Sequence, residues 1–292
     1  MSGPFERVGI RPLPPAPPPP RQRRGWPVCS AVILAAVVLI CLGSGLLPGG
    51  DPAYMDLQNC CAPPSARFWF GTDAMGRDVF AMIWAGGRVS LFIGAASAAA
   101  STAIGVAVGA AAGWAPGWMD GLLMRLTEIL LSVPSLLLVV LLQAALGRPG
   151  PLSLALALGA VGWTGIAKVV RTEVRQMRRC GYIQAAKSMG GGFFYLLRRH
   201  MAPNFFPSIL FMIVMNVRNA IAAEATLSFM GLGLPPEAVT WGAMLSLAEK
   251  AALGGAWWAV LAPGIFLAAV LLSMTSLGER LRGRAGQGEG NL

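Results

Sequence analysis

Long apolar runs alternate with short polar segments along the whole chain. Each run is about as long as the roughly 20 residues that an α-helix needs to cross a bilayer, whereas a transmembrane β-barrel requires alternating segments of about ten residues. The pattern predicts an all-α polytopic membrane protein with about six transmembrane helices. We place the six helices near residues 28–47, 89–119, 121–146, 152–170, from just after Pro203 and Pro207 to 234, and 251–277.

Composition agrees with a protein that is embedded in a membrane. Of the 292 residues, 55% are hydrophobic and 12% are charged, which is about half the charged fraction of soluble domains. The formal net charge of +10 could indicate a nucleic-acid partner. The positive residues, however, gather in a few loops and both tails, as orientation signals do. We therefore expect contact with the lipid bilayer and not with nucleic acid.

The distribution of positive charge also predicts the orientation. With six spans, the N-terminal tail, the loop between spans four and five and the C-terminal tail share one side and hold 16 of the Lys and Arg residues. The segments on the other side hold five: Arg67, Arg77, Arg88, Arg148 and Lys250. By the positive-inside rule, both termini lie in the cytoplasm.

Four regions follow from this reading. Residues 1–26 contain RPLPPAPPPPRQRR and are predicted to form a disordered Pro/Arg-rich cytoplasmic tail. Residues 27–85 hold the first transmembrane helix and a periplasmic segment. A signal peptide would be shorter and would end in a small-residue cleavage site, unlike LPGGDP here. Residues 86–280 form the transmembrane core, with a loop at 180–204, and residues 281–292 form a flexible cytoplasmic tail.

A tight polar turn is predicted in the periplasmic segment. Asp73 is expected to cap the helix that follows, and Asp73 and Asp78 can form an ion-pair cluster with Arg77. We interpret the turn as a structural clasp and not as a catalytic carboxylate pair, since no nucleophile or His accompanies it. Its residues are Gly71, Thr72, Asp73, Gly76, Arg77 and Asp78.

Several helices carry informative residues. The 89–119 run is uncharged and rich in Gly, Ala and Ser, which favours a central position in the bundle. Pro134 is predicted to kink or break the third span, with Ser132 or Ser135 bonding the freed backbone groups. The fourth span includes Trp163 near its middle and is predicted to run straight on into the basic stretch without a breaker. Its basic stripe faces lipid headgroups and comprises Lys168, Arg171, Arg175 and Arg178.

Four charged residues lie within predicted spans. Arg125 and Glu128 are three residues apart and can neutralise each other. Arg218 and Glu224 are six apart, so they lie on different faces and are not expected to pair. Charges at depth face the bundle interior, a water path or a partner. A structural role stays open for Arg218 and Glu224. The long side chain of Arg218 could instead extend to the cytoplasmic surface.

The residues required for metal binding or catalysis are scarce. Five cysteines and one His form no cluster with metal-ligand spacing, so no metal site is expected. The sequence also shows no nucleophile and base arranged as in an active site, which counts against a membrane-embedded enzyme. A glycine-rich phosphate loop ending in Gly-Lys-Ser/Thr is also absent. The chain is therefore expected to bind no cofactor and not to hydrolyse ATP by that route.

The basic loop between spans four and five is the most distinctive segment. Lys168 to Asn204 carries 8 of the 23 Lys and Arg residues. A short helix through Gln184–Met189 is predicted to end at Gly190, and a second amphipathic stretch leads to Pro203. Two short helices joined by a glycine turn predict a rigid knob, in which the small Ala185–Ala186 face suits docking in a partner groove.

This loop resembles a known family. The pattern QAA, three residues, Gly190, nine residues and HMAPN is similar to the EAA motif of binding-protein-dependent ABC importer permeases, with Gln184 where the family usually has Glu. The segments GTDAMGRD, LLMRLTEILLSVPSLLL, EATLSFMGLGLPPEAVTWGAML and LGERLR extend the similarity over about residues 68–283. The chain resembles the C-type permease subunit of dipeptide, oligopeptide and nickel importers.

The resemblance implies a set of partners in the bacterial inner membrane. They are a homologous B-type permease subunit, two cytoplasmic ATPases that bind ATP and Mg, and an extracytoplasmic solute-binding protein. The solute would be a di- or oligopeptide, or alternatively nickel, a metal chelate or an opine-type solute. A standalone secondary transporter is a remote alternative. The residues that would couple ATPase motion to transport are Gln184, Ala185, Ala186, Gly190, Pro203 and Asn204.

Overall fold

The computed structural model describes residues 27–46, 51–147, 150–235 and 238–288. The Pro-rich segment 1–26 lies outside this range, so its prediction stays untested. Within the described residues, every regular element is a helix, apart from an isolated bridge between Thr72 and Asp78. This agrees with the predicted all-α class.

The helices, in chain order, are α1 (Pro27–Leu42), α2 (Val79–Trp114), α3 (Gly117–Ser132), α4 (Ser135–Leu146), α5 (Pro151–Gly162), α6 (Thr164–Met177), α7 (Gly181–Ser188), α8 (Phe193–Leu196), α9 (Ala202–Phe229), α10 (Trp241–Leu253) and α11 (Trp258–Gly288). Two short 3₁₀ turns, η1 (Ser44–Leu46) and η2 (Leu57–Asn59), follow α1, and a π-helical turn, η3 (Leu197–Met201), joins α8 to α9.

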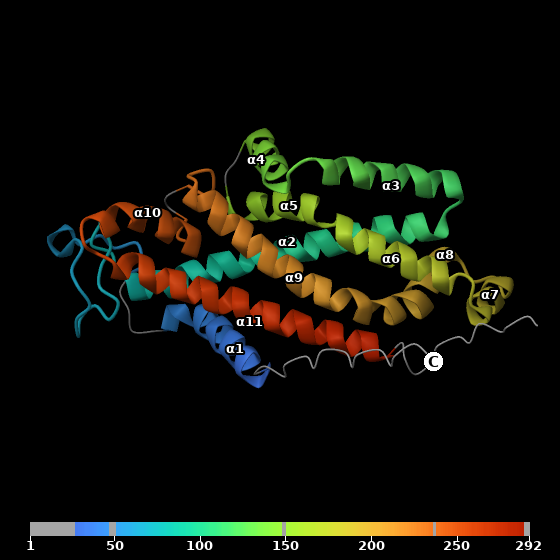
Figure 1. Cartoon of the computed structure of the whole chain (residues 1–292), viewed down its shortest axis with the longest axis horizontal. Helices are drawn as coiled ribbons and strands as arrows, with labels where there is room; N and C mark the ends of the chain where they lie inside the picture. The colour runs from blue at the N-terminus through green and yellow to red at the C-terminus, as the bar shows by residue number, and fades with distance from the viewer. Residues whose placement is uncertain (1–26, 47–50, 148–149, 236–237, 289–292) are drawn as a thin grey trace, which may run out of the picture.

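The long helices run lengthwise through an elongated molecule, with α2 near its centre (Figure 1). α2 packs against α5, α6 and α9, while α11 packs against α9 and α1. α10 and the segment 51–78 lie at one end, and α7 and α8 lie at the other (Figure 1). These are called below the α10 end and the α7 end.

Small residues explain why α2 is central. A Cβ added at Gly109 would lie 2.5 Å from the carbonyl oxygen of Ala167, and one at Gly113 would lie 2.8 Å from that of Arg171. On another face, a Cβ at Gly94 would lie 2.7 Å from Ile221. Only glycine at these positions allows α6 and α9 to approach α2 so closely. The predicted central position of this helix is confirmed.

The lengths of the helices bear on the number of spans. In the described part of the chain, α2, Phe193–Phe229 and Trp258–Gly283 are each long and apolar enough to cross a membrane, and the number rises to five if each of two bent pairs of helices is one span. The apolar part of α1, Cys29–Leu42, is shorter than these helices. Six spans therefore require α1 to be counted as well.

Both bent pairs have an identifiable break. α3 and α4 meet at 95° beside Pro134, and Ser132 Oγ donates to the carbonyl of Ile129 at 2.7 Å, as predicted. α5 and α6 meet at 45°, so the prediction of an unbroken fourth helix was wrong. The chain changes direction at Trp163, where the two helices share a residue as cap.

Several helices also begin or end at residues that differ from the predicted ones. α2 begins at Val79, ten residues earlier than predicted, because Asp78 caps it. α9 begins at Ala202 and includes both prolines. Pro203 falls in the first turn, where no backbone donor is needed, and Pro207 lies inside the helix. α11 begins only at Trp258, after α10 has ended at a turn with Gly255 at φ +94°. α11 continues through Gly288, so residues 281–288 are helical.

Candidate functional site

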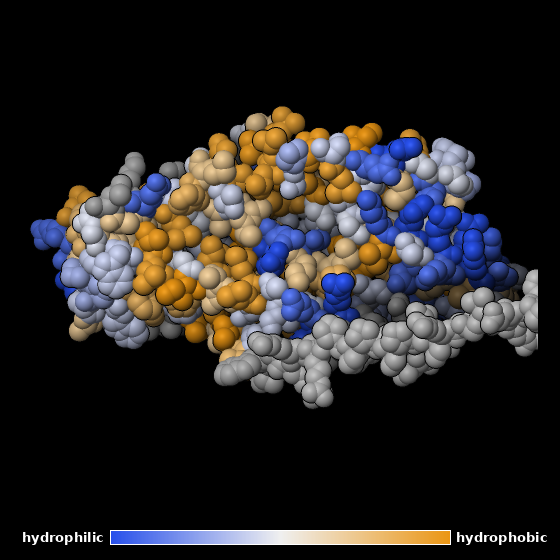
Figure 2. Space-filling model, viewed as in Figure 1, coloured by the Kyte–Doolittle hydropathy of each residue, from blue (hydrophilic) through white to orange (hydrophobic). Residues whose placement is uncertain are grey.

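The α7 end presents apolar side chains on a polar surface. Hydrophilic residues gather there, whereas the middle of the molecule is largely apolar (Figure 2). Met189 and Phe194 are nevertheless each 82% exposed, and Tyr195 is 57% exposed. We call five of the exposed residues of α7, α8 and the turn between them the docking surface: Gln184, Ala185, Met189, Phe194 and Tyr195.

The structure distributes the predicted loop residues over two faces. Gln184, Ala185 and Gly190 are exposed, but Ala186 is buried and faces the core. The predicted outward Ala185–Ala186 face was therefore wrong for Ala186. Its carbonyl accepts the backbone N–H of Gly191 at 3.0 Å, which closes the end of α7.

The end of α7 follows the predicted turn chemistry. Gly190 has φ +89°, a left-handed conformation that glycine adopts without strain. Pro203 and Asn204 lie further along, exposed on the first turn of α9, and Asn204 Nδ2 donates to the carbonyl of His200 at 2.6 Å. These two residues therefore belong to the helix after the loop and not to the docking surface.

Trp114, the last residue of α2, joins the short helices to the bundle. The ammonium of Lys187 in α7 lies 5.5 Å from its ring centroid, and the ring of Phe193 in α8 also lies 5.5 Å away. The guanidinium of Arg178 lies 5.7 Å from the same ring, and its Nη1 donates to the Trp114 carbonyl at 2.8 Å. One aromatic side chain thus contacts α7, α8 and the end of α6.

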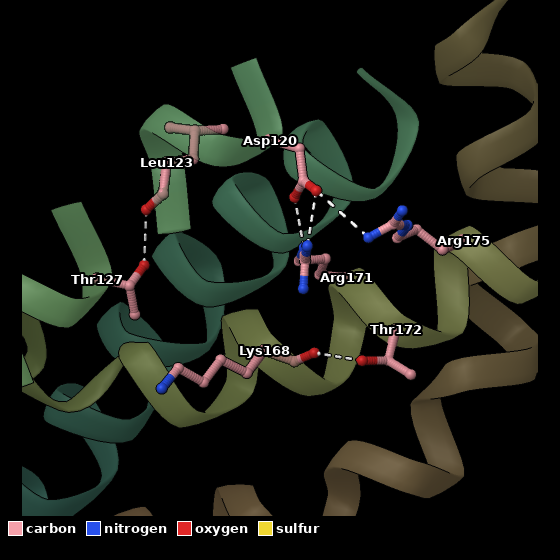
Figure 3. Close-up of polar contacts among 7 residues, drawn as sticks. All are labelled: Asp120, Leu123, Thr127, Lys168, Arg171, Thr172 and Arg175. Atoms are coloured by element: carbon pink, nitrogen blue, oxygen red, sulfur yellow. Dashed lines mark hydrogen bonds and ion pairs between the residues drawn. The ribbon is translucent and has the colours of Figure 1, made fainter. Parts of the chain in front are cut away.

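Asp120 joins α3 to α6 (Figure 3). Arg171 donates to its carboxylate through Nε and Nη2, the latter at 2.6 Å. Arg175 Nη1 reaches the same carboxylate at 3.3 Å. Both arginines come from α6 and Asp120 comes from the first turn of α3 (Figure 3). We call these three residues the ionic clamp.

The clamp adds contacts that were not predicted for the basic stripe. Arg171 and Arg175 bind Asp120 of α3, and Arg178 binds the carbonyl of Trp114 in α2. Lys168 is exposed, and its carbonyl accepts from Thr172 Oγ1. Sequence reasoning missed Asp120. The available signal was an acidic residue in the turn APGWMD, on the same predicted side as the stripe.

The predicted polar turn lies at the α10 end. Asp73 accepts the backbone N–H groups of Met75 and Arg77, both at 2.9 Å, and its other oxygen pairs with the Arg77 guanidinium at 2.6 Å. Asp78, and not Asp73, caps α2 by accepting from Phe80 N at 2.9 Å. Burial raises the pKa of Asp78, and backbone hydrogen bonds oppose that rise.

The remaining turn residues are brought together closely. Thr72 Oγ1 donates to the carbonyl of Asn59 at 2.5 Å and accepts from Ala62 N, while Gly71 accepts at its carbonyl from Val79 N. Gly76 has φ +73°, and a Cβ there would lie 1.8 Å from the carbonyl oxygen of Asp56. Only glycine fits this position, because neighbouring backbone fills the space.

Glu224 is the buried polar centre of the α10 end. It is fully buried and accepts from Ser90 Oγ at 3.1 Å and Ser228 Oγ at 2.9 Å. Ser90 Oγ in turn accepts from the backbone N–H of Trp241 at 3.3 Å, and Trp241 Nε1 donates to the Ile83 carbonyl at 2.9 Å. We call Ser90, Glu224, Ser228 and Trp241 the buried lock, since it ties α2, α9 and α10 together.

The other predicted intramembrane charges differ from Glu224. Arg125 and Glu128 pair at 3.0 Å on an open face of α3, with side chains 81% and 55% exposed. Arg218 does not pair with Glu224, as predicted, and it contacts Asn219 and Thr275 instead. Across the described residues, no group of three or more His, Cys, Asp or Glu could hold a metal ion.

Comparison with known proteins now adds to this geometry. Residues 105–286 match the family described as binding-protein-dependent transport system inner membrane component. The match includes the docking surface and the ionic clamp. The chain belongs to this family. It is an inner-membrane, C-type permease subunit of an ABC importer, which is a transport component and not itself an enzyme.

Three relatives show how far the similarity of this permease extends. The dipeptide transport system permease protein DppC of Bacillus subtilis (strain 168) is 39% identical over 86% of this chain and 78% of its own length. The oligopeptide permease OppC of the same organism is 36% identical over 86% and 82%. The probable D,D-dipeptide permease DdpC of Escherichia coli (strain K12) is 36% identical over 88% and 84%.

Proposed function

We propose that this permease forms half of the translocation pathway of an ATP-driven importer of di- or oligopeptides. Its partners would be a homologous B-type subunit, two cytoplasmic ATPases that bind ATP and Mg, and an extracytoplasmic solute-binding protein. The peptide substrate is supported by the names of three relatives, all of which are peptide permeases. In this proposal the chain itself binds no cofactor.

The docking surface is the observation that carries the proposal. Patches of exposed apolar side chains mark interaction sites in proteins, and Met189, Phe194 and Tyr195 are exposed close together in the chain at the most hydrophilic end of the molecule. From the positive-inside rule we expect that end to lie in the cytoplasm. A cytoplasmic ATPase is therefore the partner that fits this surface.

The contacts between the docking surface and the helix bundle suggest how motion of a bound ATPase would be transmitted to the long helices. α7 and α8 contact Trp114 at the end of α2, and α8 continues through η3 into α9. Arg178 and the ionic clamp then connect α6 to α2 and α3. Motion of the docked ATPase would thus reach four long helices through packed aromatic and ionic contacts, and alternate the access of the pathway.

Reconstitution tests the transport activity. The permease, its B-type partner and the two ATPases are placed in proteoliposomes with the binding protein outside and ATP inside, and uptake of a labelled dipeptide is measured. We expect uptake that stops when ATP is replaced by a non-hydrolysable analogue. Uptake of nickel ions but not peptide would support the metal alternative, and uptake without ATPases would support a secondary transporter.

Substitution on the docking surface tests the coupling. The double substitution Met189→Glu and Phe194→Glu should abolish co-purification of the ATPases and ATP-driven uptake, because it places two charges in an apolar contact. Met230→Glu is a matched control, since Met230 is 62% exposed beyond the other end of α9. That variant should keep its ATPases. Equal ATPase binding by wild type and the double variant would contradict the proposal.

A further inference from the structure

Both helix breaks border one cavity of about 590 Å³, which also touches the middle of α2 and one face of α9. The breaks lie at Pro134, between α3 and α4, and next to Trp163, between α5 and α6. Sites for small ligands have volumes of about 300–1,000 Å³. Ser97 in the lining is about 27 Å from the start of α2 and about 26 Å from its end. The cavity therefore lies beside the middle of the longest described helix.

The lining of this cavity combines apolar and polar side chains, and none of the described residues in it is charged. Leucine side chains come from α3, α4 and α5. Hydroxyl and amide side chains come from α2, α3, α6 and α9 and include Ser97, Ser101, Ser132, Thr164, Asn216 and Asn219. A mainly apolar wall with a few polar groups is the usual composition of a site for a small ligand.

Some of these polar groups stabilise the break between α5 and α6. Ser101 Oγ donates to the carbonyl of Gly159 at 3.1 Å, and Asn216 Nδ2 donates to the carbonyl of Gly162 at 3.3 Å. Non-helical backbone at membrane depth is tolerated only where it is buried in protein or lines a water-filled cavity. These two donors therefore have their acceptors within the chain.

Two hydroxyl groups in the lining have no such partner. Ser97 is 3% exposed and Thr164 is 6% exposed, yet neither hydroxyl has a hydrogen-bond partner among the described residues, and neither oxygen is fully enclosed by protein atoms. Buried polar groups are nearly always hydrogen-bonded. These hydroxyls therefore indicate a partner that the described chain does not supply.

Asn219 adds a third polar group, on the open side of the cavity. It is exposed, and its Oδ1 accepts from Arg218 Nη2 at 2.7 Å. Since the side-chain amide also has an N–H₂ group, Asn219 keeps a donor for a ligand. Together with the two hydroxyls, which can donate or accept, the cavity offers both kinds of hydrogen-bonding group.

The lining favours a neutral, hydrogen-bonding ligand. A charged group in this cavity would lose its hydration without meeting an opposite charge, which is costly. An alkyl chain would leave the buried hydroxyls unpaired, which is also costly. A backbone amide carries one donor and one acceptor and no charge, and apolar side chains next to it could pack against Leu130 and Leu158.

We propose that this cavity binds a main-chain amide group of the peptide as it passes through the permease. Ser97, Thr164 and Asn219 would form hydrogen bonds to that amide, while the charged ends of the peptide stay in water on the open side. The ligand class is thus the uncharged backbone of a short peptide. The inference rests on the proposed function, to which it adds a solute site.

Photolabelling tests where the solute binds. The complete complex of both permease subunits and both ATPases is placed in nanodiscs without the binding protein, whose own preference then plays no part. The probe is trialanine in which the central residue is replaced by a diazirine amino acid. After irradiation, we expect adducts at residues 97–101, 130–139, 158–165 and 216–223, which border the cavity. An excess of unlabelled trialanine should abolish them.

Two modified competitors test which group of the peptide is bound. Trialanine with an N-methyl group on its central amide should require about fivefold more peptide for half-maximal competition, because one hydrogen bond is lost. Trialanine that is acetylated and amidated at its ends has no charge. It should compete as well as free trialanine, since no charged side chain lines the cavity among the described residues.

Conservative variants test the residues. Thr164→Val keeps the shape of the side chain and removes the hydroxyl, so half-maximal competition by trialanine should require about fivefold more peptide. Ser97→Ala provides a second variant with the same expected direction. Thr226→Val is the matched control, because that hydroxyl donates to the carbonyl of Ala222 at 2.8 Å on another part of α9. It should bind trialanine as wild type does, and co-purification of the B-type subunit shows that each complex has assembled.

The outcomes separate this inference from the function on which it rests. If the reconstituted wild type takes up no labelled trialanine with ATP, the proposed function is wrong. If uptake occurs but the adducts lie elsewhere, or excess trialanine does not remove them, the cavity is not a solute site. Equal competition by the N-methylated peptide, or none by the peptide with blocked ends, would show that the site does not bind the neutral amide, and would overturn the inference.

Discussion

Each end of the molecule holds a carboxylate that joins helices, but the partners of the two carboxylates differ. At the α7 end, Asp120 is bound by two guanidinium groups whose side chains are 26% and 53% exposed. At the α10 end, Glu224 is fully buried and is bound by neutral hydroxyl groups. The first connection is ionic and is partly open to water on its arginine side, whereas the second has neutral donors and is closed to water.

This difference indicates which end can move. Ion pairs that are partly in water contribute little net free energy and can be exchanged for water at small cost. Buried hydrogen bonds are costly to break, because each group left unpaired loses its solvation as well. We therefore expect the ionic clamp to rearrange when an ATPase pulls on α7, while the buried lock keeps α2, α9 and α10 as one unit.

The largest expected effect comes from emptying the buried lock. Glu224→Ala leaves the hydroxyl groups of Ser90 and Ser228 without their acceptor and opens a cavity between α2 and α9. We expect the free energy of unfolding to fall by about 3 kcal/mol or more. Thermal unfolding of the purified subunit in detergent measures the loss as a lower midpoint.

The matched control for this change lies on α3. Glu128→Ala removes the same side chain from an exposed ion pair, so unfolding should change by no more than about 0.5 kcal/mol. Equal destabilisation by the two variants would contradict the assignment of Glu224 to a stabilising centre.

Close helix contacts at the α10 end give a second, smaller effect. A Cβ on Gly242 in α10 would lie 2.5 Å from Cα of Ala225 in α9, so Gly242→Ala should force the helices apart and cost about 1–3 kcal/mol. Gly121→Ala on α3 has no neighbour within 4 Å and should be neutral or stabilise by up to about 1 kcal/mol. Unfolding midpoints of both variants would show the difference, and identical midpoints would refute tight packing at α10.

The ionic clamp should affect coupling more than stability. Asp120→Asn weakens both contacts to Arg171 and Arg175, and we expect about 1 kcal/mol of destabilisation. The number of peptides transported per ATP hydrolysed should fall about fivefold, equivalent to about 1 kcal/mol of coupling free energy. Asp120→Glu, which keeps the charge, should restore the ratio. An unchanged ratio in Asp120→Asn would limit the clamp to a structural role.

Features encoded by neighbouring residues could be predicted from the sequence. The helical class follows from the length of the apolar runs, the break at Pro134 from proline chemistry, and the end of α7 from Gly190. The loop pattern around Gln184 and Gly190 was also sufficient to indicate the family. In each case the deciding physics acts within a few residues of the chain.

Features that depend on distant residues could not be predicted in the same way. Asp120 and Arg171 are 51 positions apart, and Ser90 and Glu224 are 134 apart. Nothing local identifies such partners, so the clamp was missed and its arginines were assigned to lipid. The inward face of Ala186 was missed for the same reason, because its neighbour Leu196 belongs to another helix.

The smallest expected effect separates ionic from neutral connections by their response to salt. Arg175 makes one contact with Asp120 at 3.3 Å and is half exposed, so Arg175→Gln should lower the free energy of unfolding by about 0.5 kcal/mol or less. Raising the salt from 0.1 to 1 M shortens the Debye length from about 10 to 3 Å, and the difference in unfolding free energy from wild type should then disappear.

The loss of unfolding free energy in Ser228→Ala, which changes the buried lock, should persist at both salt concentrations, because neutral hydrogen bonds in a closed site are not screened. Unfolding midpoints of the two variants at each concentration decide the matter. A salt-independent deficit in Arg175→Gln would mean that the clamp is held by packing and not by charge.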